Sequence, residues 1–139
     1  MIIIDTNVIS EPSRQKPDQR VIEWLDQQVR STLFLTSVSV AELYRGIALL
    51  PEGRRKFNLK SETDQLLEPL FSTRVLPFDL AAAHIYAQVS SKAKRGGFDI
   101  SLADGQIASV ALTHGFAVAT RDVAPFEAAG VKVINPWEG

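Results

Sequence analysis

Short apolar runs separated by longer helical segments are the feature that most limits how this chain can fold. Four runs are predicted to be β-strands, at residues 1–4, 32–36 ("TLFLT"), 116–120 ("FAVAT") and 131–135 ("VKVIN"), with a short extended piece at 74–78. Strands that are apolar along their whole length are typical of parallel sheets covered by helices on both faces. Their alternation with helices predicts an α/β fold, a three-layer α/β/α sandwich with a mainly parallel sheet.

Capping residues set the predicted limits of the helices. Asp18 begins a helix over residues 18–28, and Ser39 with Glu42 three residues later matches a capping box that begins a helix over 39–50. Ser101 and Asp104 repeat that spacing for a helix over 101–115, and two more helices are predicted at 54–71 and 80–95. The chain has no repeat or interdomain linker, so we expect one domain over residues 1–139.

Composition and charge exclude several functional classes. The 139 residues include no cysteine, which excludes disulfides, thiolate metal sites and cysteine nucleophiles. The formal net charge is −1, whereas a protein that binds DNA stably on its own is usually basic. No apolar run approaches the ~20 residues of a membrane span, and the first residues do not resemble a secretory signal. We therefore predict a cytoplasmic protein with no membrane partner.

Four acidic residues that are far apart in the sequence are predicted to meet at one edge of the sheet. Asp5 directly follows the first strand, and Asp122 follows "FAVAT". Glu42 and Asp104 are expected in the first turns of helices that begin at the same edge. This is the carboxyl edge of the parallel strands, where open α/β sheets bind their ligands. The four acids are therefore the candidate site.

A group of carboxylates at one place favours a bound divalent cation. Unneutralised carboxylates repel one another, and Mg²⁺ or Mn²⁺ prefers oxygen ligands. The cluster contains no Cys or His, which argues against zinc. Such an ion polarises a phosphodiester and activates water, so the chemistry that we predict is metal-dependent phosphodiester hydrolysis. The alternative is structural, because Glu42 and Asp104 suit the third position of a capping box, and Asp122 suits a cap of a short helix.

Four motifs also carry a resemblance to a known family. "IDTNVISE", "SVAELYRG", "LADGQIA" and "VATRD" resemble the successive acidic motifs of PIN-domain proteins, and in particular of VapC/FitB toxins from bacterial toxin–antitoxin pairs. The resemblance extends to the "NPW" ending and covers essentially the whole chain. It implies a PIN-like fold and a Mg²⁺- or Mn²⁺-dependent endoribonuclease, the toxic component of a type II pair. Asp5, Glu42 and Asp104 match the family's metal-binding acids, and Asp122 matches the fourth, where other members often have Asn.

The resemblance also implies supporting residues and partners. Thr6, Asn7 and Thr120 match polar positions beside the acids, and we expect Thr6 and Thr120 to orient the carboxylates. The implied partners are a cognate antitoxin protein (VapB/FitA-like) and an RNA substrate. The resemblance further implies a homodimer and a higher complex with the antitoxin, with DNA contacted only through the antitoxin.

Two other functions and several residues stay open at this point. A receiver-like signalling module shares the acidic magnesium pocket, but it needs a second acid after the first strand and a lysine where this chain has Arg121. A non-catalytic module of the same fold is disfavoured by the intact acids. Arg45 and Arg121 could each neutralise an acid or hold a phosphate, and Asp99 is a secondary acid. The basic stretches "GRRKFNLK" and "KAKRGG" suit solvated helix faces, with RNA contact as the second interpretation.

Overall fold

A parallel five-stranded sheet is the centre of the computed structural model, which describes residues 1–138. The strand order is β3-β2-β1-β4-β5, and every neighbouring pair is parallel. The predicted parallel sheet is confirmed, and the extended piece at 74–78 supplies its edge strand. The strands are β1 (Ile2–Ile4), β2 (Leu33–Thr36), β3 (Val75–Leu76), β4 (Ala117–Ala119) and β5 (Val133–Ile134).

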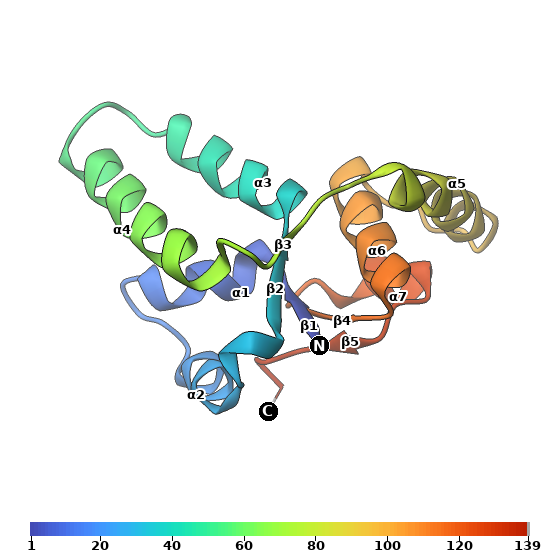
Figure 1. Ribbon diagram of the computed structural model, residues 1–139, viewed down its shortest axis with the longest axis horizontal. Helices are drawn as coiled ribbons and strands as arrows, with labels where there is room; N and C mark the ends of the chain where they lie inside the picture. Colours follow the sequence, from blue (N-terminus) through green and yellow to red (C-terminus); the bar gives the residue numbers. More distant parts are fainter. Residues whose placement is uncertain (139) are drawn as a thin grey trace.

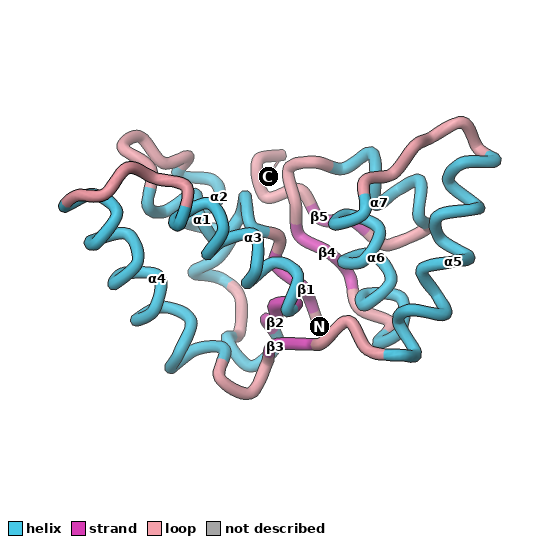
Figure 2. Tube along the Cα trace, turned by 90° about the horizontal axis from the view of Figure 1, so that it is seen from above, coloured by secondary structure: helices cyan, strands magenta, loops and turns pink. Residues whose placement is uncertain are grey.

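Helices cover both faces of the sheet, as the three-layer prediction requires. Helices α1 to α4 lie on one side and α5 to α7 on the other (Figures 1 and 2). Within the described part of the chain, no helix is both long and apolar enough to cross a membrane. The helices are α1 (Thr6–Ser10), α2 (Gln19–Gln27), α3 (Ser37–Ala48), α4 (Arg54–Phe71), α5 (Leu80–Arg95), α6 (Leu102–His114) and α7 (Val123–Ala129), with 3₁₀ turns η1 (Glu11–Ser13) and η2 (Arg30–Thr32).

Strand β1 contributes to a hydrophobic core on each face of the sheet. Successive side chains of a strand point to opposite faces, so Ile3 and Ile4 enter different cores. Ile3 packs in the core that contains Phe126 of α7, and Ile4 packs in the core that contains Val8 of α1 and Leu35 of β2. All five side chains are at most 1% exposed, which explains why the first strand is apolar throughout.

The helix boundaries agree with the prediction at Asp18 and Ser101, which cap α2 and α6, but not at α3. Helix α3 begins two residues earlier than predicted, at Ser37, because the Thr36 side chain accepts the Ser39 N–H at 3.0 Å. Ser39 is therefore buried inside the helix rather than capping it, and Glu42 lies in the second turn. The segment "SEPSRQKPD", which was expected to be a loop, contains the end of α1 and the turn η1.

The strand order creates a crevice at the carboxyl edge of the sheet. Strand β1 lies between β2 and β4, so the chain leaves β1 toward one side of the sheet and returns on the other side. Connections that diverge in this way leave an opening above the strand ends, which is where ligands bind in such sheets. Asp5 follows β1 and Thr120 follows β4, so both residues are at this opening.

Candidate functional site

Asp5 is buried at the end of β1, where hydrogen bonds hold its carboxylate in one orientation. The residue is 5% exposed. The Thr6 backbone N–H donates to Oδ1 at 2.9 Å, and the Thr120 hydroxyl donates to Oδ2 at 2.8 Å. The Asp5 backbone N–H donates to the Ala119 carbonyl at 3.0 Å, which joins the ends of β1 and β4. The carboxylate is therefore positioned before any ligand arrives.

Thr120 and Asn7 connect the loop that carries Asp5 with the loop that carries Asp122. The Thr120 hydroxyl accepts the Asp122 N–H at 3.0 Å and an Asn7 Nδ2–H at 3.2 Å. Asn7 Oδ1 accepts the Arg121 N–H at 3.2 Å. These bonds give Thr120 and Asn7 the contacts expected of residues that orient the acids. Thr6 contributes its backbone N–H to this network rather than its hydroxyl.

The charges of Asp5, Asp104 and Asp122 act on neighbouring acids of the site. Burial is the main cause that raises the pKa of Asp5; hydrogen bonds from Thr120 and Thr6 lower it, and the charges of Asp104 and Asp122 raise it further. Burial also raises the pKa of Glu42, with added repulsion from Asp5 and Asp104. The pKa of Asp104 is also raised overall. Burial is the main cause, a hydrogen bond with Ser101 opposes it, and the charge of Asp122 adds to it.

Capping positions are occupied by Asp5 and Asp104 but do not account for Glu42 or Asp122. Asp5 is the N-cap of α1, and its Oδ1 accepts the Thr6 N–H. Glu42 lies in the second turn of α3, beyond the positions that a capping box uses. Asp122 precedes α7, but its side chain makes no capping hydrogen bond. Asp104 does occupy the third position of α6, where its backbone N–H donates to Ser101 Oγ at 3.2 Å. The structural alternative is therefore weaker for Glu42 and Asp122 than the sequence indicated.

The donor atoms of the site suit a hard divalent cation. Carboxylates surround the opening, and no cation among the described residues contributes to the raised pKa values of Asp5, Glu42 and Asp104. Across residues 1–138, no three acidic, histidine or cysteine side chains are arranged to hold one metal ion directly. Mg²⁺ typically binds through one or two carboxylates and keeps several waters. The set of oxygen donors fits such an ion.

Three charged residues near the acids in sequence do not join them. The Arg121 guanidinium lies over the Trp137 ring, 5.2 Å from its centroid. The pKa of Asp18 is lowered mainly by its hydrogen bond with Arg20, and the charge of Arg121 lowers it slightly further. Arg121 and Arg45 are not among the groups that shift the pKa values of the acids. Asp99 is exposed and is also outside this coupled group.

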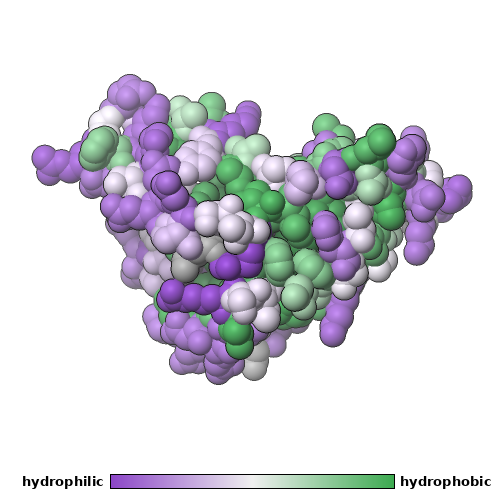
Figure 3. Space-filling model, in the orientation of Figure 1, coloured by the Kyte–Doolittle hydropathy of each residue, from purple (hydrophilic) through white to green (hydrophobic). Residues whose placement is uncertain are grey.

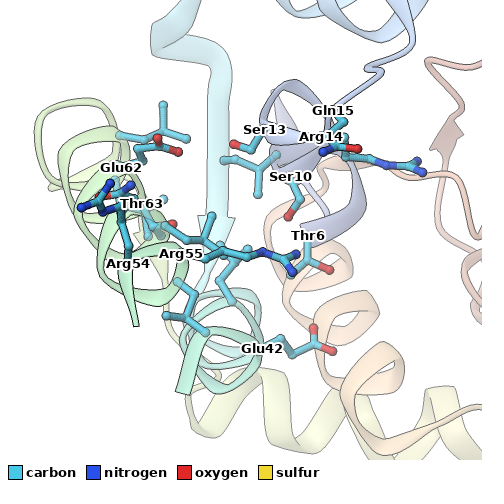
Figure 4. Close-up of a pocket in the computed structure, with 18 of the residues that line it drawn as sticks. Thr6, Ser10, Ser13, Arg14, Gln15, Glu42, Arg54, Arg55, Glu62 and Thr63 are labelled. Carbon is cyan, nitrogen blue, oxygen red and sulfur yellow. The ribbon is translucent and has the colours of Figure 1, made fainter. Parts of the chain in front are cut away.

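A cleft of about 1370 Å³ opens beside the acids, between α1 and η1 on one side and α3 and α4 on the other (Figure 4). Thr6 and Glu42 line it together with Arg54 and Arg55, which come from the basic stretch "GRRKFNLK". The sequence predicts a solvated helix face for that stretch, and Arg54 and Arg55 are indeed exposed, but they also line this cleft. No local pattern signals this position, because it depends on how α4 packs back over α1 and α3.

The sequence analysis does not predict an ion pair on the cleft wall between a buried acid and an exposed arginine. Glu11 is only 2% exposed, and its Oε1 lies 3.1 Å from Nη1 of Arg14, which lines the cleft. The spacing of three residues in "EPSR" is the one signal that was present. The two prolines of "SEPSRQKPD" predict a loop, in which a spacing of three residues does not indicate that side chains are neighbours.

Comparisons with known proteins identify the family. The model of the PIN domain matches residues 2–132. The chain is 50% identical over 137 residues to the toxin FitB of Neisseria gonorrhoeae, covering 99% of each chain. It is 49% identical over 138 residues to the VapC ribonuclease Y4jK of Sinorhizobium fredii, again covering 99% of each. The crystal structure of FitAcB from N. gonorrhoeae is similar with a TM-score of 0.96 at 49% identity, covering 100% of both chains. With this match in sequence and in fold, the chain belongs to the PIN-domain family and, within it, to the VapC/FitB type.

Proposed function

We propose that this chain is the toxic component of a type II toxin–antitoxin pair, an endoribonuclease that depends on Mg²⁺ or Mn²⁺. The observation that carries the proposal is the buried Asp5 carboxylate at the carboxyl edge of the sheet, held by Thr6 and Thr120 and close enough to Asp104 and Asp122 for their charges to act on it. Relatives named as a toxin and as a ribonuclease support the same activity. Residues 1–139 would act as one cytoplasmic domain.

The proposal gives each site residue a role. One or two of Asp5, Glu42, Asp104 and Asp122 would bind the metal directly and the others through its water ligands. The metal would supply Lewis-acid polarisation of the phosphodiester and a lower pKa for water. The Thr120 hydroxyl and the Thr6 N–H hold the two oxygens of Asp5 in position, and Asn7 supports Thr120. Loss of hydrogen bonds that orient a metal-binding side chain typically lowers metal affinity about 10–100-fold.

A receiver-like signalling function is disfavoured by the position of Arg121. A receiver needs a cationic side chain that faces the acids from the end of a late strand. Arg121 occupies that point of the sequence, but its guanidinium stacks on Trp137.

We propose a cognate VapB/FitA-like antitoxin as the protein partner. Similar solved structures include FitAcB and FitAB bound to an IR36 DNA fragment. A net charge of −1 gives this chain little general attraction for DNA, so DNA contact would come through the antitoxin. Apolar side chains gather in the hollow between α3 and α5 (Figure 3), and a homodimer would cover such a surface.

Cleavage of single-stranded RNA by the purified protein tests the activity. We expect cleavage with Mg²⁺ or Mn²⁺ and none with excess EDTA. Asp5→Asn and Asp104→Asn should abolish cleavage, because each removes a charge that the metal needs. Asp99→Asn is the matched control, since Asp99 is an exposed acid close in sequence to Asp104 but outside the coupled group. Full activity in both site variants, or in EDTA, would overturn the proposal.

A further inference from the structure

The basic start of α4 faces the candidate site across the cleft. Arg54 and Arg55 are the first two residues of α4, and both line the cleft that Thr6 and Glu42 also line. Figure 4 shows the Arg55 side chain extending across the cleft toward Thr6. The Arg54 side chain turns the other way, toward Glu62. Two adjacent arginines of one helix therefore differ in their position relative to the acids.

Arg55 brings a positive charge that no neighbouring acid neutralises. Its guanidinium forms no ion pair with any side chain in residues 1–138. Among the other cations of this region, Arg14 is paired with Glu11 at 3.1 Å and Lys56 with Glu52 at 2.5 Å, whereas Arg54 and Lys16 also line the cleft without an ion pair in residues 1–138. Arg55 differs from Arg54 in extending toward Thr6. A guanidinium binds phosphate oxygens through two parallel N–H bonds, so an unpaired arginine in a cleft suits an anionic ligand.

An RNA substrate needs a cation at this place. The four carboxylates repel a phosphodiester backbone, and the net charge of −1 provides no general attraction to offset that repulsion. A metal ion neutralises the acids, but it leaves the neighbouring nucleotides of the strand without a contact. Arg55 lies on the wall opposite Thr6, where the strand would continue from the acids into the cleft.

We propose that Arg55 binds a backbone phosphate of the RNA adjacent to the scissile bond and thereby holds the strand in the cleft. The inference rests on the proposed nuclease function, because it assigns a substrate contact to that site. It predicts a contribution to binding that depends on the charge and planar shape of the side chain. Arg54, with the same charge on the same turn of α4, should contribute little.

Direct binding tests the proposal without requiring cleavage. A fluorescein-labelled single-stranded RNA is titrated with wild type and variants in EDTA at low ionic strength, and fluorescence anisotropy gives Kd. We expect Arg55→Ala to weaken binding about tenfold, as the loss of a charge-assisted hydrogen bond does. The slope of log K against log salt should become flatter by about 0.7, the value for one phosphate contact on a single strand. Arg55→Lys should bind with intermediate affinity, because lysine keeps the charge but not the fork.

Arg54→Ala is the matched control, because it removes the same charge from the general field but no proposed contact with RNA. It should therefore change Kd less than about twofold. Equal weakening by the two alanine variants would overturn the proposal in favour of that general field. No measurable RNA binding by wild type, or an unchanged Kd in Arg55→Ala, would also overturn it. Thermal melts of the variants establish that each is folded.

Cleavage kinetics separate this contact from the proposed chemistry. With Mg²⁺, Arg55→Ala should raise KM for RNA and change kcat little, because the phosphate contact is made in both the bound substrate and the transition state. A wild-type protein that binds RNA through Arg55 but cleaves none would contradict the proposed function while leaving the Arg55 contact intact. A loss confined to kcat would contradict the contact as proposed.

Discussion

Replacement of Thr120 by valine removes the hydroxyl that joins the two loops of the site while keeping the shape of the side chain. Thr120 is fully buried, at 0% exposure. Its hydroxyl donates to Asp5 Oδ2 at 2.8 Å and accepts bonds from the Asp122 N–H at 3.0 Å and from Asn7 Nδ2 at 3.2 Å. Valine can form none of the three, so the buried Asp5 carboxylate loses a donor.

The contacts of Thr120 set the expected loss of stability. A hydrogen bond to a charged group contributes about 1.5–3 kcal/mol, and a neutral one about 0.5–1.5 kcal/mol. Asn7 is only partly buried and Asp122 is exposed, so water replaces much of what those two groups lose, whereas Asp5 is 5% exposed. We therefore expect the free energy of unfolding of metal-free protein to fall by about 3 kcal/mol, mostly through Asp5. For a domain of this size, that lowers Tm by about 10 °C.

The loss should depend on pH in a direction that Asp5 determines. Burial raises the folded-state pKa of Asp5 above 3.8, and the Thr120 hydroxyl opposes that rise. Without the hydroxyl the folded-state pKa is higher still. A raised carboxyl pKa means that the folded state binds the proton more tightly, so stability falls as pH rises through that pKa. The deficit of the valine variant should therefore be smaller in mild acid and grow as pH rises through the window between the two folded-state pKa values.

Urea unfolding of the metal-free proteins across this pH range measures the effect. Thr120→Ser is the control, because serine keeps the hydroxyl and loses one methyl group, at a cost of about 1 kcal/mol. If the valine variant is no less stable than the serine variant, or if its deficit does not change with pH, the hydroxyl does not hold Asp5 as described.

Two further predictions concern the metal and the packing of α6. Mn²⁺ at a hundredfold excess over Kd should stabilise the wild type by about 2.7 kcal/mol, and much less an Asp5→Asn, Asp104→Asn double variant; equal Tm rises would place the metal elsewhere. Gly105→Ala should lower stability by about 1–3 kcal/mol, because its Cβ would lie 2.8 Å from Cε2 of Tyr86. Gly46→Ala has no atom within 4 Å of its Cβ, so a melt that shows the same loss in both variants would contradict this reason.

Local patterns were sufficient for the fold class and for the edge of the sheet at which the acids lie. Apolar runs of strand length can be buried only between helices, and parallel strands end at a common edge, so Asp5 and Asp122 could be placed together without a structure. The start of α3 could not be predicted in the same way. Thr36 and Ser39 are both good caps, and the choice depends on where β2 leaves the sheet rather than on either residue type.

The sequence by itself determined that acids gather at the carboxyl edge, because strand ends and helix starts depend mainly on neighbouring residues. Only the tertiary structure decided which groups donate hydrogen bonds to those acids and which cations lie near them. The bond between Thr120 and Asp5 joins residues 115 positions apart, and it exists because β1 and β4 pair. Likewise, Arg55 faces the site and Arg54 does not, because the packing of α4 over the cleft sets their directions. Side-chain direction across a cleft depends on how distant helices pack, and no periodicity in one helix encodes it.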